Sequence, residues 1–301
     1  MANLLSELLE RTSRTFAATI PLLEEPLRAQ VEVAYLLFRI ADTLEDADLL
    51  PRDPRVEALG KFAALLAAEH PSSSALQKFV AWCASHPPTA NADYACLLEH
   101  TPYVFVGLEE CDDRAAAAIR RHLRSTTQRM ASFVLRADEK GSLALTDLAD
   151  LRAYCYAVAG IVGEMLCELV LLDQPVLAPV KSDLERDAVA FGEALQLVNI
   201  LKDAGADAKE GRTYVPKSVD RAAVFALAAE DLVRAHRYTE VLHGNGARRG
   251  TLAFHALPIR LADQTLVVVK KDGPGAKIPR TMVAAEIAAM NASLDAGGSG
   301  L

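Results

Sequence analysis

Apolar residues along the chain recur at intervals of three and four, which is the spacing of helices that bury one face or more. Leu and Ala dominate these stretches, and strand-like alternation is nearly absent. Prolines and glycines separate the stretches, but no break is long enough to be a linker between domains. The pattern predicts an all-α, single-domain helical bundle around a central cavity. The predicted helices span residues 27–48, 54–69, 74–85, 91–110, 113–137, 146–171, 182–206, 217–242, 249–269 and 280–293.

Two aspartate pairs with the same spacing interrupt helical stretches that are otherwise apolar. They are Asp42 with Asp46, and Asp203 with Asp207. This spacing places both carboxylates of a pair on one helix face about one turn apart, so two such helices facing each other would form a cage of oxygen ligands. Magnesium binds through a few carboxylates together with water and substrate phosphates. The pairs therefore predict a magnesium site, and the alternative for each is an ordinary amphipathic surface helix.

A third aspartate pair has the same spacing but a different context. Asp183 and Asp187 follow Lys181 and Ser182, which resemble a helix cap, and the segment itself is highly charged. A solvated first helical turn explains this pair, so we expect no metal there.

The second pair continues a narrow polar stripe at helical spacing. The stripe begins at Gly192 and Gln196, passes Asn199 and ends at Asp203 and Asp207, while apolar residues occupy most of the remaining positions. A surface helix usually carries a wide stripe of Lys and Glu. The narrow stripe instead predicts the wall of a polar cavity.

Around the first pair, an apolar helix face ends in acidic residues. Tyr35 and Arg39 lie on or beside the face that reaches Asp42 and Asp46. The Arg39 guanidinium can pair with Asp42 within the helix, or it can bind a phosphate group in a bidentate manner.

Composition limits the classes of partner. About half of the 301 residues are hydrophobic, which allows a large core, and the net charge of −8 argues against a nucleic-acid partner. An anionic substrate would need a metal ion or a local basic patch. The five cysteines are odd in number and lack close pairs, so we expect reduced core residues in a cytoplasmic protein.

The chain has no sequence typical of membrane insertion. Residues 1–10 lack the basic and apolar regions of a secretory signal, and no run of about 18 uncharged apolar residues occurs. We therefore expect no spanning helix, and peripheral membrane contact stays open. We expect residues 294–301, which include an Ala-Gly-Gly-Ser-Gly stretch, to form a flexible tail.

Three further segments carry candidate chemistry. The stretch from Tyr154 to Gly163 is apolar on nearly every side, and its glycines Gly160 and Gly163 predict either a kink beside the cavity or close packing. The phenol of Tyr154 could transfer a proton or stabilise a cation. The segment 209–216 offers Arg212 and Tyr214 after the second aspartate pair, and the segment 13–16 reads Ser-Arg-Thr-Phe. The glycines between 244 and 250 have the wrong spacing for a dinucleotide loop.

Taken in order, these motifs resemble the squalene and phytoene synthase family. They are Ser13-Arg-Thr-Phe16, the segment 34–46 ending in Asp42-Thr-Leu-Glu-Asp46, the segment 154–164, and the segment from Leu195 through Asp203 to Arg212-Thr-Tyr-Val-Pro216. Order and spacing agree over about residues 10–285. The resemblance implies an all-α isoprenoid synthase fold and head-to-head condensation of two prenyl diphosphates, most simply two farnesyl diphosphates, through presqualene diphosphate.

The resemblance also implies roles for individual residues. Lys202 stands where the family often has Arg. The implied metal ligands are Asp42, Asp46, Asn199, Asp203 and Asp207, the implied catalytic residues are Tyr154, Arg39 and Arg212, and the implied substrate-binding residues are Ser13, Arg14, Phe16, Tyr35, Gln196, Lys202 and Tyr214. Candidates for the cavity floor are Met130, Phe133 and Met165.

The product depends on the fate of the last cation. Squalene synthases quench it with hydride from NADPH, whereas dehydrosqualene and phytoene synthases lose a proton. The segment 273–280 resembles the basic element near the NADPH of squalene synthases, which implies that Lys277 and Arg280 bind this cofactor and favours squalene as the product. The alternative for these two residues is an exposed helix start. Other hypotheses are a terpene cyclase and a non-catalytic helical assembly factor, and no obligate protein partner is inferred.

Overall fold

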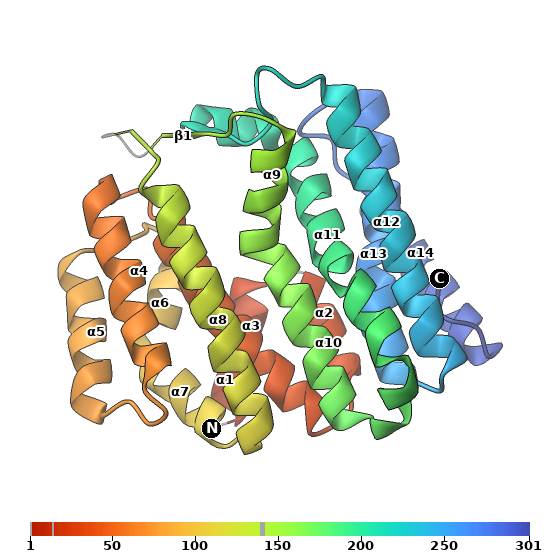
Figure 1. Cartoon of the computed structure of the whole chain (residues 1–301), viewed down its shortest axis with the longest axis horizontal. Coiled ribbons are helices and arrows are strands. Elements are labelled where there is room, and N and C mark those ends of the chain that lie inside the picture. The colour runs from red at the N-terminus through yellow and green to blue at the C-terminus, as the bar shows by residue number, and fades with distance from the viewer. Residues whose placement is uncertain (1, 14, 139–141) are drawn as a thin grey trace. The chain divides into compact units, whose positions relative to one another are not determined.

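The computed structural model describes residues 2–13, 15–138 and 142–301, and it confirms an all-α chain (Figure 1). The chain divides into two compact units. The first unit contains Met1–Pro21 and Glu25–Leu143, and the second contains Leu22–Glu24 and Ala144–Leu301. Each unit is described by itself, and the prediction of one domain over residues 1–301 stays a prediction.

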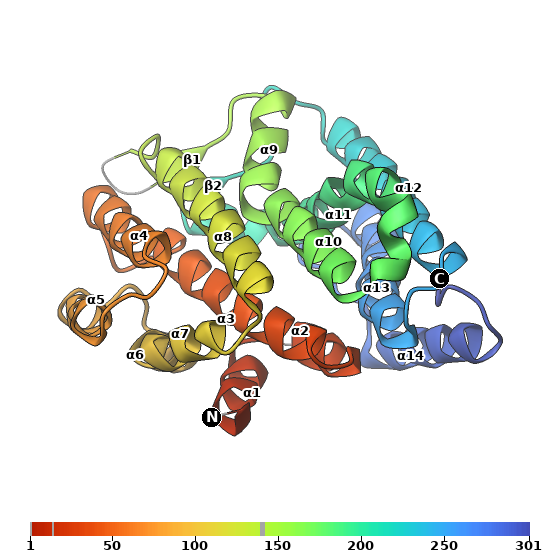
Figure 2. The ribbon, with the colours of Figure 1, turned by 60° about the horizontal axis from the view of Figure 1, so that its bottom comes forward.

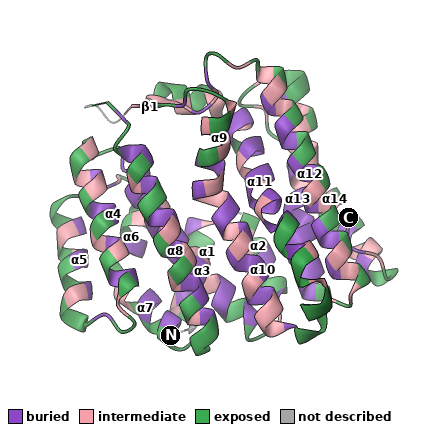
Figure 3. Cartoon of the chain, viewed as in Figure 1, coloured by how far each residue is buried: buried purple, intermediate pink, exposed green. Residues whose placement is uncertain are grey.

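The first unit is built around helix α3 (Leu27–Glu45), which packs against α1, α4, α7 and α8. Its apolar positions at helical spacing are buried, including Leu37, Ile40 and Leu44. Helix α8 shows buried and exposed positions alternating around its axis, as expected for a helix with one face on the core (Figure 3). The other helices are α1 (Ala2–Thr12), α2 (Thr15–Thr19), α4 (Arg52–Ala67), α5 (Ser73–Ser85), α6 (Ala92–Glu99), α7 (Thr101–Glu109) and α8 (Asp113–Val134), and the 3-10 turn η1 (Ile20–Leu22) ends at the unit boundary.

The second unit is built around helix α11 (Lys181–Lys209), which packs against α10, α12 and α13. Helix α14 (Arg280–Asp295) lies beside α13 (Figure 2). The remaining helical elements are α9 (Leu148–Cys155), the π-helical turn η2 (Tyr156–Gly160), α10 (Ile161–Asp173), the 3-10 segment η3 (Pro175–Val180), α12 (Arg221–Gly244) and α13 (Arg249–Asp272). The two-residue strands β1 (Leu143–Ala144) and β2 (Arg212–Thr213) pair with each other.

Helix boundaries differ from the prediction in three places. The single helix expected over residues 91–110 is two helices that meet at His100, because Pro102 in the first turn of α7 has no N–H to continue the α6 ladder. The helix expected over 146–171 contains the π-helical turn η2, and helix α1 was not predicted at all.

Helix α11 approaches α10 and the preceding π-helical turn η2 through two glycines. A Cβ on Gly163 would lie 2.0 Å from the carbonyl oxygen of Ala188, and a Cβ on Gly192 would lie 1.9 Å from that of Ala159. Only hydrogen fits at either position. Of the two roles expected for the glycines of this segment, close packing applies to Gly163. Gly192 belongs to the same contact and does not line a polar cavity, which corrects the role predicted for it.

The C-terminal segment is packed, which corrects the prediction of a flexible tail over residues 294–301. Ser299 is 6% exposed, and its hydroxyl donates to the Glu240 carboxylate at 2.7 Å. The Gly297 carbonyl oxygen lies 2.9 Å from Nε2 of His243. These contacts with side chains of α12 fix a sequence whose small residues alone predict disorder.

Two helices in the second unit are long and apolar enough to cross a membrane by length and composition alone, which does not by itself contradict the expectation that no helix spans a membrane. They span Leu148–Asp173 and Arg249–Asp272. More than half of the residues in each apolar window are buried inside the protein, as in core helices. Burial in the core therefore accounts for their apolar character.

Candidate active site

In the first unit, Arg39 lies at the centre of a polar and aromatic cluster. Its Nη2 donates to the Tyr35 hydroxyl at 2.8 Å, and its Nη1 lies 3.5 Å from an Asp42 carboxylate oxygen. The Tyr35 hydroxyl in turn donates to the carbonyl oxygen of Thr12 at 3.3 Å. The Arg39 Cζ also lies over the rings of Tyr35 and Tyr94, at 5.5 and 5.7 Å from their centroids. The intrahelical ion pair expected as one alternative is present but long, so donors remain for an anion, and phosphate binding by Arg39 stays a prediction.

The electrostatics of this cluster favour a bound cation. Burial, helped by repulsion from Asp46, raises the pKa of Asp42 to about 6, although Arg39 opposes the shift. Burial acts against the charge of Arg39, but Asp42 and the two tyrosines outweigh it and raise the pKa of the guanidinium. A divalent cation beside Asp42 and Asp46 would relieve the repulsion between the two carboxylates, so the pair fits a magnesium ion.

The N-terminal motif contributes an ordered turn to the first unit. The Ser13 hydroxyl accepts hydrogen bonds from the backbone N–H groups of Phe16 and Ala17, at 3.1 and 3.3 Å. The ring of Phe16 lies 5.5 Å from the ring of Tyr35, measured between centroids. Ser13 thus acts as a helix cap in this structure. Arg14, which was predicted to bind substrate, lies outside the described residues.

In the second unit, the polar stripe of α11 already gathers oxygen atoms around a cation. The Lys202 Nζ lies 3.1 Å from the Asn199 amide oxygen and 3.2 Å from a carboxylate oxygen of Asp203. An amide and a carboxylate oxygen that converge on an ammonium group form a donor set of the kind magnesium prefers. These residues therefore fit the predicted metal, and the ammonium is the cation that they hold in this structure. Gln196 and Asp207 are half-buried on the same helix.

Tyr154 and Tyr214 form a stacked pair beside α11. Their ring centroids lie 4.7 Å apart with an interplanar angle of 23°, and both side chains are buried. A backbone hydrogen bond next to β1 and β2 helps to hold Tyr214 in place, since the N–H of Leu145 donates to the carbonyl oxygen of the preceding residue, Thr213, at 3.0 Å. Arg212, in β2, forms an ion pair with Glu210. The structure thus brings the aromatic residues of two separate motifs together.

The basic segment before α14 is attached to the same helix. The N–H of Gly275 donates to the carbonyl oxygen of Lys202 at 2.7 Å. Lys277 and Arg280 are exposed, and neither forms an ion pair with any residue that the structure describes. Unpaired cations on a segment fixed beside α11 fit the phosphate groups of a dinucleotide.

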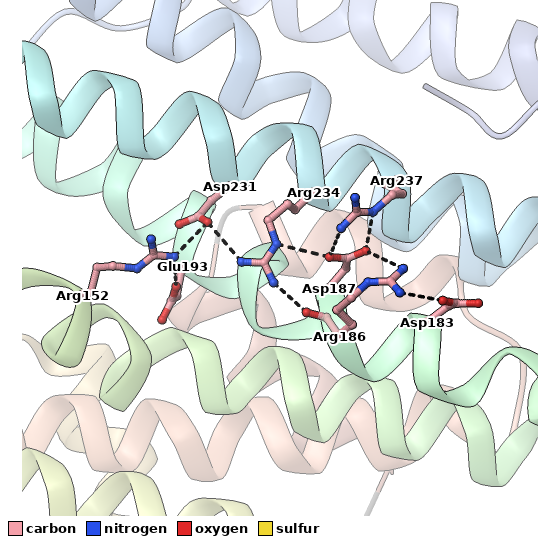
Figure 4. A network of polar contacts seen from close by, with 8 residues as sticks. All are labelled: Arg152, Asp183, Arg186, Asp187, Glu193, Asp231, Arg234 and Arg237. Carbon is pink, nitrogen blue, oxygen red and sulfur yellow. Dashed lines mark hydrogen bonds and ion pairs between the residues drawn. The ribbon is translucent and has the colours of Figure 1, made fainter. Parts of the chain in front are cut away.

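Asp187 corrects the interpretation of the third aspartate pair. Its side chain is fully buried, and its carboxylate accepts from Arg237 at 2.5 and 2.6 Å and from Arg234 at 3.2 Å (Figure 4). Burial acts against the charge of Asp187, but the arginines prevail and lower its pKa. Only Asp183 is solvated as expected, with half of its side chain exposed. The arginines neutralise the Asp187 carboxylate, and the expectation of no metal at this pair stays a prediction.

The same network reaches the helix that carries Tyr154. Arg152 of α9 donates to Glu193 at 3.4 Å and to Asp231 at 3.2 Å, which ties α9 to α11 and α12 (Figure 4). Burial and repulsion from Asp231 raise the pKa of Glu193, while burial raises the pKa of Asp231. Sequence reasoning missed this cluster, because its members come from three helices far apart along the chain.

The predicted ligands fall into two sets. Asp42 and Asp46 belong to the first unit, whereas Asn199, Asp203 and Asp207 belong to the second. Across residues 2–13, 15–138 and 142–301, no group of three or more His, Cys, Asp and Glu side chains could hold a metal ion. The single cage expected from the sequence therefore stays a prediction. The cavity-floor candidates Met130, Phe133 and Met165 are all buried.

Comparison with known proteins identifies the family. The model of the squalene/phytoene synthase family matches residues 9–247. The squalene synthase of Eremothecium gossypii is 31% identical over 219 residues, which are 71% of this chain and 45% of that protein. The phytoene synthase of Thermus thermophilus is 40% identical over 99 residues, 33% of this chain and 30% of that protein. The chain thus spans less than half the length of these curated relatives.

A solved structure of TcSQS with a ligand has the same fold, with a TM-score of 0.76 and 22% identity over 98% of this chain and 88% of that chain. A dehydrosqualene synthase with a ligand gives a TM-score of 0.52 at 18% identity, over 98% of this chain and 96% of that chain. Because the family model covers most of the residues and the fold agrees, the chain belongs to the squalene/phytoene synthase family.

Proposed function

We propose that the protein condenses two farnesyl diphosphates head to head, through presqualene diphosphate, to squalene, with magnesium and with NADPH as the reductant. The observation that carries the proposal is the convergence of Asn199 and Asp203 oxygens on the ammonium group of Lys202, at 3.1 and 3.2 Å. Amide and carboxylate oxygens of this kind suit a magnesium ion on the helix that carries the second aspartate pair. Family membership supports the reaction type.

Each group at the site has a role that follows from its chemistry. Asp42 and Asp46 in the first unit, and Asn199, Asp203 and Asp207 in the second, would hold magnesium, which would supply positive charge to stabilise a leaving diphosphate. Arg39 offers guanidinium donors to the diphosphate. Lys202 offers a single ammonium group. An apolar environment around the substrate would protect an allylic cation from hydrolysis.

Two tyrosines, Tyr154 and Tyr214, have roles in the proposed proton transfer and in stabilising a carbocation. The buried phenol of Tyr154 lies against the ring of Tyr214, so its hydroxyl has a fixed direction within the second unit. We assign proton transfer in the first half-reaction to this hydroxyl. The two aromatic faces also favour a nearby carbocation, because the negative face of a ring attracts positive charge.

Lys277 and Arg280 would hold the phosphate groups of NADPH, which supplies the hydride for the last step. Both are exposed and without an ion pair in the described part of the chain, and the Gly275 hydrogen bond fixes their segment beside Lys202. The location of the enzyme follows from its product. We propose a cytoplasmic protein that contacts the membrane surface peripherally to release its hydrocarbon.

The experiment that tests the proposal is magnesium-dependent release of pyrophosphate from farnesyl diphosphate. Asp42→Asn and Asp203→Asn should each nearly abolish release while the circular dichroism spectrum stays unchanged. Asp183→Asn is the matched control, because it makes the same substitution in the third aspartate pair, and it should behave as the wild type. Full activity in either of the first two variants would contradict the metal-binding role.

A further inference from the structure

We propose that Tyr94 is a positioning residue, whose ring holds the Arg39 guanidinium in the orientation that binds the substrate diphosphate. Tyr94 lies in α6 and belongs to none of the motifs identified in the sequence. The inference rests on the proposed function, in which Arg39 binds diphosphate. It concerns a residue of the first unit alone, so it can be tested apart from the second aspartate pair.

The guanidinium lies over two aromatic rings that come from different helices. The Arg39 Cζ is 5.5 Å from the ring centroid of Tyr35 and 5.7 Å from that of Tyr94. A cation over an aromatic face is attracted by the negative charge of the ring face. Tyr35 lies one turn before Arg39 on the same helix, so it moves together with α3. The ring of Tyr94 is therefore the contact that fixes the guanidinium relative to another element.

Hydrogen bonds alone hold Arg39 weakly. Of its five N–H groups, one donates to the Tyr35 hydroxyl at 2.8 Å. The distance to Asp42, 3.5 Å, is that of a long ion pair, and Nε is buried without a hydrogen-bond partner among the described residues. Packing between rings thus fixes the group while several donors remain for a bidentate anion.

Tyr94 is itself held in the first turn of α6. The Asn91 side chain accepts from the backbone N–H groups of Asp93 and Tyr94, at 2.9 and 3.2 Å, and so caps the helix. Arg11 of α1 donates from Nε to the Asp93 carboxylate at 2.9 Å. These contacts fix the backbone that carries the Tyr94 ring. A positioning role requires a fixed ring. If the Arg39 side chain is already ordered before the diphosphate binds, less conformational entropy is lost on binding.

The test compares Tyr94→Leu, which removes the ring, with Tyr94→Phe, which keeps it. Steady-state pyrophosphate release should give a KM for farnesyl diphosphate about tenfold higher in Tyr94→Leu, with kcat within about threefold of the wild type, because the ring acts on binding of the diphosphate. Tyr94→Phe should stay within about twofold of the wild type in KM. The control is Tyr103→Leu, which removes a ring that is 51% exposed and contacts His100 rather than Arg39, and it should leave KM unchanged.

An unchanged KM in Tyr94→Leu would overturn the inference, and so would a fall in kcat alone or an equal effect in Tyr103→Leu. If the wild type releases no pyrophosphate, the proposed function fails by itself. Calorimetric titration of inorganic pyrophosphate then still tests the inference, since Tyr94→Leu should bind it about tenfold more weakly. If Tyr94→Leu does not fold, the wild-type NMR spectrum decides. The Arg39 Nε–H resonance should be shifted upfield by the rings, and a resonance at the position of exposed arginines would overturn the inference.

Discussion

The ring of Tyr154 lies stacked on the ring of Tyr214, with centroids 4.7 Å apart and planes inclined by 23°. One tyrosine comes from helix α9 and the other from the segment after β2, so the pair joins two motifs separated by about 60 residues in sequence. The stack fixes the ring of Tyr154, whose hydroxyl is the group to which we assign proton transfer. A substitution that removes only the hydroxyl should therefore separate chemistry from packing.

Tyr154→Phe should lower kcat by about 100-fold, which is the lower range for loss of a positioned proton-transfer group. KM for farnesyl diphosphate should change by less than about threefold, because the aromatic contact with Tyr214 is kept. Pyrophosphate release measures both constants. Tyr103→Phe, on the exposed ring of α7, is the control. A Tyr154→Phe enzyme with wild-type kcat would show that another group moves the proton.

Removing Lys277 and Arg280, the two exposed cations at the start of α14 that form no ion pair with a described residue, should affect only the reductive step. Lys277→Ala with Arg280→Ala should raise the KM for NADPH by about 10- to 100-fold, as expected for lost hydrogen bonds to charged groups. Release of pyrophosphate in the first half-reaction should persist. The matched control is Lys270→Ala with Lys271→Ala, which removes two exposed lysines at the end of α13. Equal squalene formation by both double variants would show that NADPH binds elsewhere.

Gly163→Ala should destabilise the protein strongly. Its new Cβ would lie 2.0 Å from the Ala188 carbonyl oxygen, which is backbone and cannot rotate away, so we expect a loss of about 3 kcal/mol in the free energy of unfolding. Gly60→Ala, in the middle of α4 with nothing within 4 Å of the new Cβ, should instead stabilise by about 0.5–1 kcal/mol. Urea denaturation measures both. Similar stability of the two variants would contradict the close crossing of α10 and α11.

His255 should make stability sensitive to acid. Burial lowers the pKa of this imidazole to about 4. The hydrogen bond from the imidazole Nδ1 to the Thr251 carbonyl oxygen favours the charged form and opposes this shift. Below the ordinary imidazole pKa of 6.5 the unfolded chain binds a proton at His255, whereas the folded chain does not until the pH approaches 4. Neutral His255 therefore costs the folded state no stability above pH 6.5. As the pH falls from 6.5 towards 4, protonation of the unfolded chain lowers the free energy of unfolding, and the loss reaches about 3 kcal/mol at pH 4.

The variant His255→Phe removes the titrating group from a site already surrounded by Phe191, Tyr238 and Phe254. Its free energy of unfolding should fall less between pH 7 and pH 4 than that of the wild type, by about the amount given above. Urea denaturation at several pH values provides the comparison. Parallel pH profiles for the two proteins would mean that the folded protein accommodates a charged His255.

Much of the fold was predictable because burial follows helical spacing. The apolar faces of α3 and α11 are continuous, so the sequence indicated both helices within a few residues. Prediction failed where a single residue ends a helix, as Pro102 does between α6 and α7, and where contacting residues come from segments distant in the sequence. The C-terminal segment looked flexible by composition, but side chains of α12 fix Ser299.

The candidate site was predictable only where its chemistry lies within one helix. Asp42 and Asp203 could be identified because each belongs to a local pattern. Asp187 carries the same pattern, and its burial among arginines depends on α12, which no local pattern reveals. Tyr94 likewise gives no signal, since only the fold brings α6 next to Arg39.

The most direct measurement is identification of the hydrocarbons that the purified protein makes from farnesyl diphosphate and magnesium, with and without NADPH, by mass spectrometry. Our account predicts squalene, formed only when NADPH is present. A C30 polyene formed regardless of NADPH would contradict the reductive step and indicate a dehydrosqualene-type product. Product from geranylgeranyl diphosphate alone would contradict the choice of substrate, and no product from either diphosphate would contradict the proposed function itself.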